Sequence, residues 1–171
     1  MEILEHPLWD NVTLGSSALT ASLFKIPIGS SSKTKYETNM ENAGQLPVGY
    51  QYTIKGISWC PLPGTVAADL LALSKGYLEL FIGNNPKFVA PLFLLPSGCG
   101  MAGVSNAALA TGGVDYWNNG IPDARSIYSL EYPIELRSGV SIKVDLTWGT
   151  APGAKTMWVF LHGYMQKQEQ I

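Results

Sequence analysis

Two neighbouring segments near the C terminus alternate apolar and polar residues without a break. In the first, the apolar positions are Tyr128, Leu130, Tyr132, Ile134 and Leu136. In the second, after a turn at Ser138-Gly139, they are Val140, Ile142, Val144, Leu146 and Trp148. A period of two sends successive side chains to opposite faces of an extended strand. Each segment therefore predicts an antiparallel strand with one face in the core and the other toward solvent.

Further strands are predicted along most of the chain. Apolar and β-branched residues bounded by turn residues predict strands over residues 17–28, 50–59, 77–82, 88–95 and 156–164. Within residues 50–59 the apolar phase shifts at Gly56, which predicts a β-bulge. Residues 88–95 are apolar at both phases, so we expect this strand at the centre of the core. Residues 29–45 are predicted as a long surface loop, and residues 96–126 as mostly loop with room for one short strand.

One segment has helical rather than strand spacing. Val66, Leu70 and Leu73 lie three to four positions apart, which predicts a short helix over about residues 65–75. Thr65 is the candidate N-cap and Gly76 the candidate stop.

Seven or eight strands and one helix, without alternation of strands and helices, predict an all-β sandwich in a single domain over residues 1–171. A single jelly roll is favoured over an immunoglobulin-like sandwich, because long loops and a helix separate the strands and the Cys–Trp–Cys arrangement is absent. The short Ser138-Gly139 turn suits a jelly roll only as its one hairpin within a sheet, or as a sharp corner between sheets. We expect residues 1–15 and the tail after Tyr164 to be a flexible arm and a flexible tail.

Charged residues are scarce. They make up 14% of the chain against 46% hydrophobic residues, and the formal net charge is −2. Uncharged side chains must therefore cover much of the surface, or neighbouring copies must do so, which predicts a homo-oligomer. Arginine occurs only at Arg125 and Arg137, and no Lys/Arg cluster is present to neutralise phosphates. We expect no direct contact with nucleic acid.

The sequence also bears on the compartment of the protein. Its first residues lack the positive region and apolar run of a secretory signal, so synthesis in a cytoplasm is expected. No uncharged apolar stretch reaches the roughly 20 residues of a membrane span. Cys60 and Cys99 suit neither a disulfide scaffold nor a zinc site, and we expect both to be free buried thiols.

Catalytic side chains are sparse. His6 and His162 are isolated from acidic residues at metal-ligand spacing, so no metal site or other cofactor is expected. Because His162 is in phase with Trp158, Phe160 and Tyr164, it is interpreted as a core or interface histidine. The carboxylates Glu131, Glu135 and Asp145 fall on the polar faces of their predicted strands, where solvated side chains are ordinary. A glycosidase pair of Glu131 and Glu135 is the remaining enzymatic alternative, and we expect no enzyme.

The strongest binding candidate is a short run with two aromatic residues between residues 96 and 126. It comprises Asp115, Tyr116, Trp117, Asn118 and Asn119. Aromatic rings beside amide side chains suit a sugar ring or a protein partner. Alternatively, the two aromatic residues plug one end of the sandwich.

The C-terminal segments resemble virion proteins of bacterial viruses. The resemblance lies in residues 121–134, in Ser138-Gly139-Val140-Ser141-Ile142-Lys143-Val144-Asp145-Leu146-Thr147-Trp148, and in the closing Trp158-Val159-Phe160-Leu161-His162-Gly163-Tyr164. More narrowly, the chain is similar to the small single jelly-roll capsid proteins of tailless icosahedral phages with an internal membrane, such as those of Thermus. The resemblance covers roughly the last 50 residues and is a pattern rather than a diagnostic motif.

This resemblance implies an icosahedral shell of upright single β-barrels, often with a second capsid protein, around a lipid membrane. The N-terminal segment contains Glu2, Glu5 and Asp10, and an acidic start suits a shell that a membrane separates from the genome. The expected location is the virion, after synthesis in the host cytoplasm. The alternative function is a carbohydrate- or receptor-binding jelly-roll module of the virion spike or adhesin type.

Overall fold

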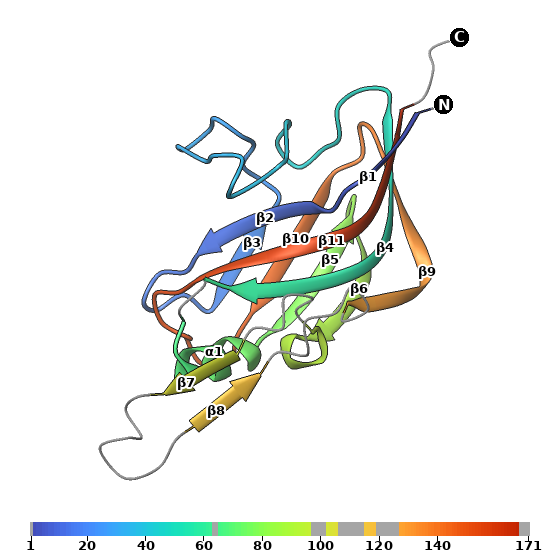
Figure 1. Cartoon of the computed structure of the whole chain (residues 1–171). Helices are drawn as coiled ribbons and strands as arrows, with labels where there is room; N and C mark the ends of the chain where they lie inside the picture. Colours follow the sequence, from blue (N-terminus) through green and yellow to red (C-terminus); the bar gives the residue numbers. More distant parts are fainter. Residues whose placement is uncertain (1, 63–64, 97–101, 106–114, 119–126, 168–171) are drawn as a thin grey trace.

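Two antiparallel sheets pack face to face in the computed structural model, which describes residues 2–62, 65–96, 102–105, 115–118 and 127–167 (Figure 1). Sheet A contains, in spatial order, β1 (Glu2–Glu5) and β2 (Leu8–Thr13) along one edge, then β11 (Thr156–Lys167), β4 (Tyr50–Pro61) and β9 (Tyr128–Arg137). Sheet B contains β3 (Thr20–Leu23), β10 (Ile142–Thr147), β5 (Tyr77–Ile82) and β6 (Asn85–Pro91). A separate pair, β7 (Ala102–Ser105) and β8 (Asp115–Asn118), lies beyond one end of the sandwich.

The strand order is that of a single jelly roll. Since β1 and β2 pair with successive parts of β11, they act as one interrupted strand, and the two sheets then contain eight strands. The chain changes sheet after every one of these strands except β5, which forms a hairpin with β6. The first strand pairs with the last, the second with the last but one, and the third with both the last and the sixth. This order confirms the predicted fold class.

The Ser138-Gly139 turn is a corner between the sheets. It joins β9 in sheet A to β10 in sheet B, and the amide of Val140 donates to the carbonyl of Arg137 across it (3.2 Å). Gly139 has a φ of +80°, a conformation that favours glycine. The predicted alternation holds throughout β10 and at most positions of β9, but the two strands lie in different sheets instead of pairing with each other.

The core lies between the inner faces of the two sheets. From β4, the side chains of Tyr52, Ile54, Ile57 and Trp59 are fully buried. The register between β4 and β9 shifts between Ile54 and Gly56, which confirms the predicted bulge. The bulge explains how apolar residues at even positions before it and odd positions after it all face the core.

Two strands near the N terminus differ from the prediction. Residues 2–5 and 8–13, interpreted from sequence as a flexible arm, form β1 and β2. Leu8 and Asp10 are buried there, and the polar Asp10 at a core-facing position hides the apolar alternation. The strand predicted over residues 17–28 is confined to β3, and β11 continues to Lys167, three residues past the predicted end. Residues 168–171 of the predicted tail lie outside the described part.

The prediction for residues 88–95 is wrong. The strand β6 ends at Pro91 and lies at the edge of sheet B, and residues Leu92–Leu94 form a 3-10 turn with Phe93 exposed. Pro86 and Pro91 lack the amide hydrogens that a central strand must donate, which restricts the segment to an edge.

In β9, the side chain of Tyr132 is 78% exposed, so the regular alternation there does not bury every apolar position.

The predicted helix is α1 (Ala67–Ser74). Thr65 is not its N-cap, because that position belongs to Val66, and the Thr65 hydroxyl donates to the carbonyl of Leu62 (2.6 Å). Gly76 follows the C-cap, and a Cβ there would lie 2.4 Å from the Nε1 of Trp148. Glycine therefore allows Trp148 to approach and donate to the Leu73 carbonyl at the end of the helix (2.8 Å).

We predict that Gly163→Ala destabilises the protein. A Cβ at Gly163 would lie 1.9 Å from the carbonyl oxygen of Thr53, so the paired backbones of β4 and β11 would have to separate. Overpacking of this kind costs about 3 kcal/mol. Urea unfolding should detect this loss, whereas Gly149→Ala, where nothing lies within 4 Å of the added Cβ, should change stability little. Equal stability of the two variants would contradict the close approach.

Candidate interaction site

The predicted aromatic run lies partly in a strand. Asp115, Tyr116, Trp117 and Asn118 form β8, which pairs antiparallel with β7, and Asn119 lies outside the described residues. The backbone of this pair lies beside α1, at the end of the sandwich reached by the β4–β5 and β6–β9 connections (Figure 1). Residues 96–126 were predicted as mostly loop with room for one short strand, and their described part contains two, β7 and β8. Binding by the run remains a prediction.

A different set of aromatic residues gathers on the outer face of sheet A, the face turned away from the core. The register aligns Trp9 with Phe160 and Phe160 with Ser58, and places Trp158 opposite Asn11 and Cys60. Their sequence neighbours Val159 and Leu161 are fully buried on the inner face. We call the outward-facing group, together with Tyr36 from the β3–β4 loop, the outer aromatic row: Trp9, Tyr36, Trp158, Phe160, His162 and Tyr164.

Loop residues extend this row past the edge strand β2. The ring of Tyr36 meets that of Trp158 edge to face, with centroids 5.3 Å apart. The indole nitrogens of Trp9 and Trp158 donate to the carbonyls of Lys35 (3.1 Å) and Tyr36 (3.2 Å). These contacts leave Trp158 only 5% exposed, while Tyr36 remains 66% exposed. The loop thus adds an aromatic side chain to the sheet surface.

His162 lies half-buried in the same face. Its Nε2 lies 2.7 Å from the Oγ of Ser58, a buried residue of the adjacent strand β4, and its ring lies near that of Phe160. Burial lowers the pKa of His162, so the neutral ring is favoured at physiological pH. His162 therefore lies on the outer face of sheet A and not in the core. Of the two sequence interpretations, this position suits an interface histidine.

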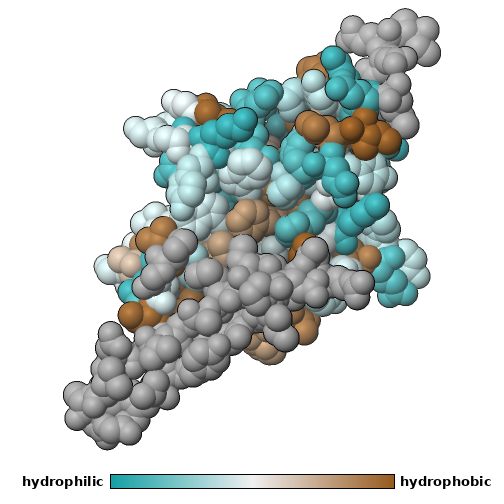
Figure 2. Space-filling model, viewed as in Figure 1, coloured by the Kyte–Doolittle hydropathy of each residue, from teal (hydrophilic) through white to brown (hydrophobic). Residues whose placement is uncertain are grey.

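Strand β11 is consequently apolar on both faces. Met157, Val159 and Leu161 face the core, and Trp158 and Phe160 face outward. Figure 2 shows this side of the molecule, where pale and brown side chains lie near the centre of the face. A sheet with one solvated face ordinarily alternates apolar and polar residues. The ammonium of Lys55 lies 4.7 Å from the centroid of the Tyr164 ring at one end of the row. The aromatic side chains between this lysine and Tyr36 are suited to packing against another surface.

The loop that carries Tyr36 is anchored to β2. The Asp10 carboxylate faces inward, where it accepts hydrogen bonds from the amide of Phe24 and from the ammonium of Lys33. Lys33 also donates to the carbonyl of Asn11 (2.7 Å). Burial raises the pKa of Asp10, while Lys33 and the Phe24 amide act in the opposite direction. The segment predicted as a surface loop is therefore fixed by a buried ion pair.

The carboxylates on the polar strand faces show no catalytic arrangement: two are hydrogen-bonded to neighbouring side chains and one is exposed. Glu135 accepts from Thr53 (3.0 Å) and Gln51 of β4, and Asp145 accepts from Ser22 (2.6 Å). Glu131 is exposed on β9. Among the described residues, no three His, Cys, Asp or Glu side chains form a group that could hold a metal ion. Cys60 is half-buried, not buried as expected, and Cys99 lies outside the described residues.

No protein-family model, curated protein or solved structure matches the chain. Within the described residues, no helix is long and apolar enough to span a bilayer.

We predict that His162 makes stability fall in mildly acidic solution. Its pKa is lower in the folded protein than the ordinary value of 6.5, so protons bind preferentially to the unfolded chain as the pH falls below 6.5. This linkage removes up to about 1.4 kcal/mol per pH unit. Unfolding free energies at pH 6.5 and about 5.5 should therefore differ less in His162→Gln than in the wild type. An unchanged pH dependence in His162→Gln would contradict the assignment.

We also predict that Lys33→Met weakens the fold by about 3 kcal/mol, because it leaves the Asp10 carboxylate buried without its cation. Side-chain exposures of 14% for Lys33 and 2% for Asp10 distinguish this pair from a surface ion pair. Part of the loss should be regained as the pH falls and Asp10 is protonated. Urea unfolding of Lys33→Met against Lys87→Met, an exposed lysine of β6, measures the difference. Similar stabilities of the two variants would show that the anchor contributes little.

Proposed function

We propose that the protein is a structural subunit of an icosahedral viral capsid, which assembles with itself and with a second capsid protein around an internal membrane. Its site of action is the virion, after synthesis in the host cytoplasm. The proposal includes no enzymatic activity, no cofactor and no direct contact with nucleic acid. The sequence resemblance supplies the kind of shell, and the fold and the outer face of sheet A support a role in assembly.

The observation that carries the proposal is the outer aromatic row. Tyr36 of the β3–β4 loop covers Trp158 within the chain, but Tyr36 itself is exposed and Phe160 is only half-buried on the same face. Apolar side chains on that face gain free energy when a neighbouring molecule removes them from water. The row therefore supports packing between subunits.

The distribution of charge also supports this arrangement. Glu2 and Glu5 lie exposed on β1, whereas Asp10 is buried and paired with Lys33. Strand β1 thus presents carboxylates, which disfavours a phosphate backbone as its neighbour. A membrane or a second protein layer between shell and genome is consistent with these charges.

We predict that the purified chain associates with increasing concentration and that Phe160→Lys reduces the association. A lysine in the outer aromatic row would have to lose its hydration at a contact between copies. Sedimentation velocity measures the distribution of species, and negative-stain electron microscopy detects shells, alone and with the other virion proteins. Asn84→Lys, which adds the same charge in the exposed β5–β6 turn, is the matched control.

Assembly of the wild type and the control, with smaller species for Phe160→Lys, would support the proposal. A wild-type chain that stays monomeric at all concentrations, and is absent from particles formed in the virus-producing source, would overturn it.

The alternative is a carbohydrate- or receptor-binding module. It is favoured by the position of Asp115–Asn118 in an added strand pair at one end of the sandwich, where connections between strands cluster. A glycan array of the wild type and Trp117→Ala tests it. Binding that depends on Trp117 would support this alternative, whereas an array without hits would oppose it.

A further inference from the structure

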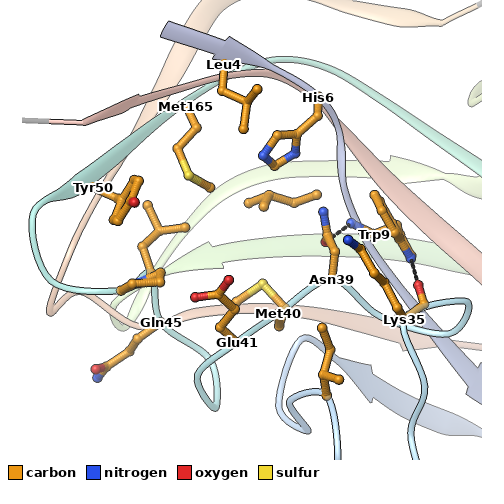
Figure 3. A pocket seen from close by; sticks show the side chains of 14 residues that line it. Leu4, His6, Trp9, Lys35, Asn39, Met40, Glu41, Gln45, Tyr50 and Met165 are labelled. Atoms are coloured by element: carbon orange, nitrogen blue, oxygen red, sulfur yellow. Dashed lines mark hydrogen bonds between the residues drawn. The ribbon is translucent and has the colours of Figure 1, made fainter. Parts of the chain in front are cut away.

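Residues of β1, β2, β11 and the β3–β4 loop line a cavity (Figure 3). Strand β1 lies at the end of the sandwich away from α1 (Figure 1). The volume of the cavity is about 470 Å³, which is within the range of small-molecule sites. The inner face of sheet A forms one wall, and the β3–β4 loop forms the other (Figure 3). Trp9 belongs to both the outer aromatic row and the cavity lining, whereas the other members of the row lie outside the lining.

The walls of the cavity are mainly apolar. Leu4 of β1 is paired in register with Met165 of β11, and both line the cavity beside Tyr50. Leu8, Met40 and Leu46 are buried residues of the main core and line its deeper part. Figure 3 shows Leu4 and Met165 on one side and Met40 on the other. The unbranched methionine side chains can adapt to a flexible apolar ligand.

The loop wall is held in place by hydrogen bonds to Pro7, between β1 and β2, and to Trp9 of β2. The side chain of Asn39 accepts from the amide of Trp9 (2.8 Å) and donates to the carbonyl of Pro7 (2.9 Å). The Asp10–Lys33 ion pair fixes the same loop nearby. These contacts fix the loop wall, which reduces the ordering that binding would require.

Polar groups lie at the cavity rim. Lys35, Glu41 and Gln45 are exposed lining residues. Among the described ion pairs, neither the Lys35 ammonium nor the Glu41 carboxylate takes part. Together they supply one positive and one negative charge, so the rim has no net preference for an anion or a cation.

We propose that this cavity binds the hydrocarbon chain of an amphipathic molecule whose head group has no net charge. The chain lies among Leu4, Leu8 and Met165, and the head group remains at the rim near Lys35 and Glu41. A zwitterionic head group can meet both charges, and an uncharged one leaves both solvated. The apolar lining that carries the proposal, Leu4, Leu8 and Met165, lies outside the outer aromatic row, so the proposal does not rest on the function proposed above.

The test uses the full-length protein and n-decylphosphocholine below its micelle concentration, with isothermal titration calorimetry as the measurement. We expect saturable binding at least tenfold tighter than that of decyl sulfate or decyltrimethylammonium, which carry the same chain with a net charge. Glycerophosphocholine, which lacks the chain, should not bind. No saturable binding of decylphosphocholine, or equal binding of glycerophosphocholine, would overturn the proposal.

Two variants locate the ligand. Leu46→Trp fills the deeper part of the cavity, and Leu4→Trp blocks it from β1, where Leu4 is 56% exposed and the fold tolerates a larger side chain. Each should weaken binding at least tenfold, while the control Leu94→Trp, an exposed residue outside the cavity lining, should bind as the wild type does. Thermal unfolding without ligand verifies that each variant is folded. Unchanged affinity in a folded Leu4→Trp protein would place the ligand elsewhere and overturn the proposal.

Flotation with phosphatidylcholine vesicles distinguishes the sources of such a ligand. Co-flotation of the wild type, lost in Leu4→Trp, would identify a membrane lipid. Binding of the monomeric amphiphile without co-flotation would identify a soluble amphiphile. Co-flotation that Leu4→Trp does not reduce would show that lipid contacts another surface and would count against the cavity.

Discussion

The buried carboxylate of Asp10 holds together the edge on which the rest of this structure depends. It accepts from the amide of Phe24 and from Lys33, and thereby ties the first strand of sheet A to the long connection between β3 and β4. The same connection places Tyr36 against Trp158 on the outer face and Met40 beside the cavity. An unpaired edge strand can pair with strands of other chains. The loop protects the edge strand β2 from such pairing, because Thr38 forms a β-bridge with Asp10. The Asp10–Lys33 ion pair therefore fixes the loop that protects the edge strand β2, packs Tyr36 on Trp158 and forms one wall of the cavity.

The parts of the fold that sequence predicts well are those in which one side-chain period dominates. The alternation in β10, the match of β5 to its predicted bounds, and the change of phase at Gly56 all reflect apolar side chains that face one core. The strand β2 was not predicted because a buried acid occupies a core-facing position, and its compensation by Lys33 lies 23 residues away. The edge position of β6 had a local signal in Pro86 and Pro91, which the apolar composition of the segment concealed.

The candidate site was less predictable than the fold. Sequence places Trp158, Phe160 and His162 in one phase, but it does not reveal which phase faces the core. The neighbouring run Met157–Leu161 is apolar at both phases, and this was an available signal that both faces of β11 are covered. The contribution of Tyr36 depends on a loop path set by Asp10 and Lys33, which no periodicity encodes.

The position of β11 affects how the chain can fold during synthesis. This strand lies between β1 and β2 on one side and β4 on the other, so those strands have no direct pairing with each other. Sheet A cannot be completed until residues 156–167 have left the ribosome, although β2 and β4 are made long before. Contacts between distant parts of a chain form slowly, and unpaired apolar strands are exposed in the meantime. A jelly roll closed by its last strand therefore depends on whatever protects β4 during that interval, whether a chaperone or rapid release of the whole chain.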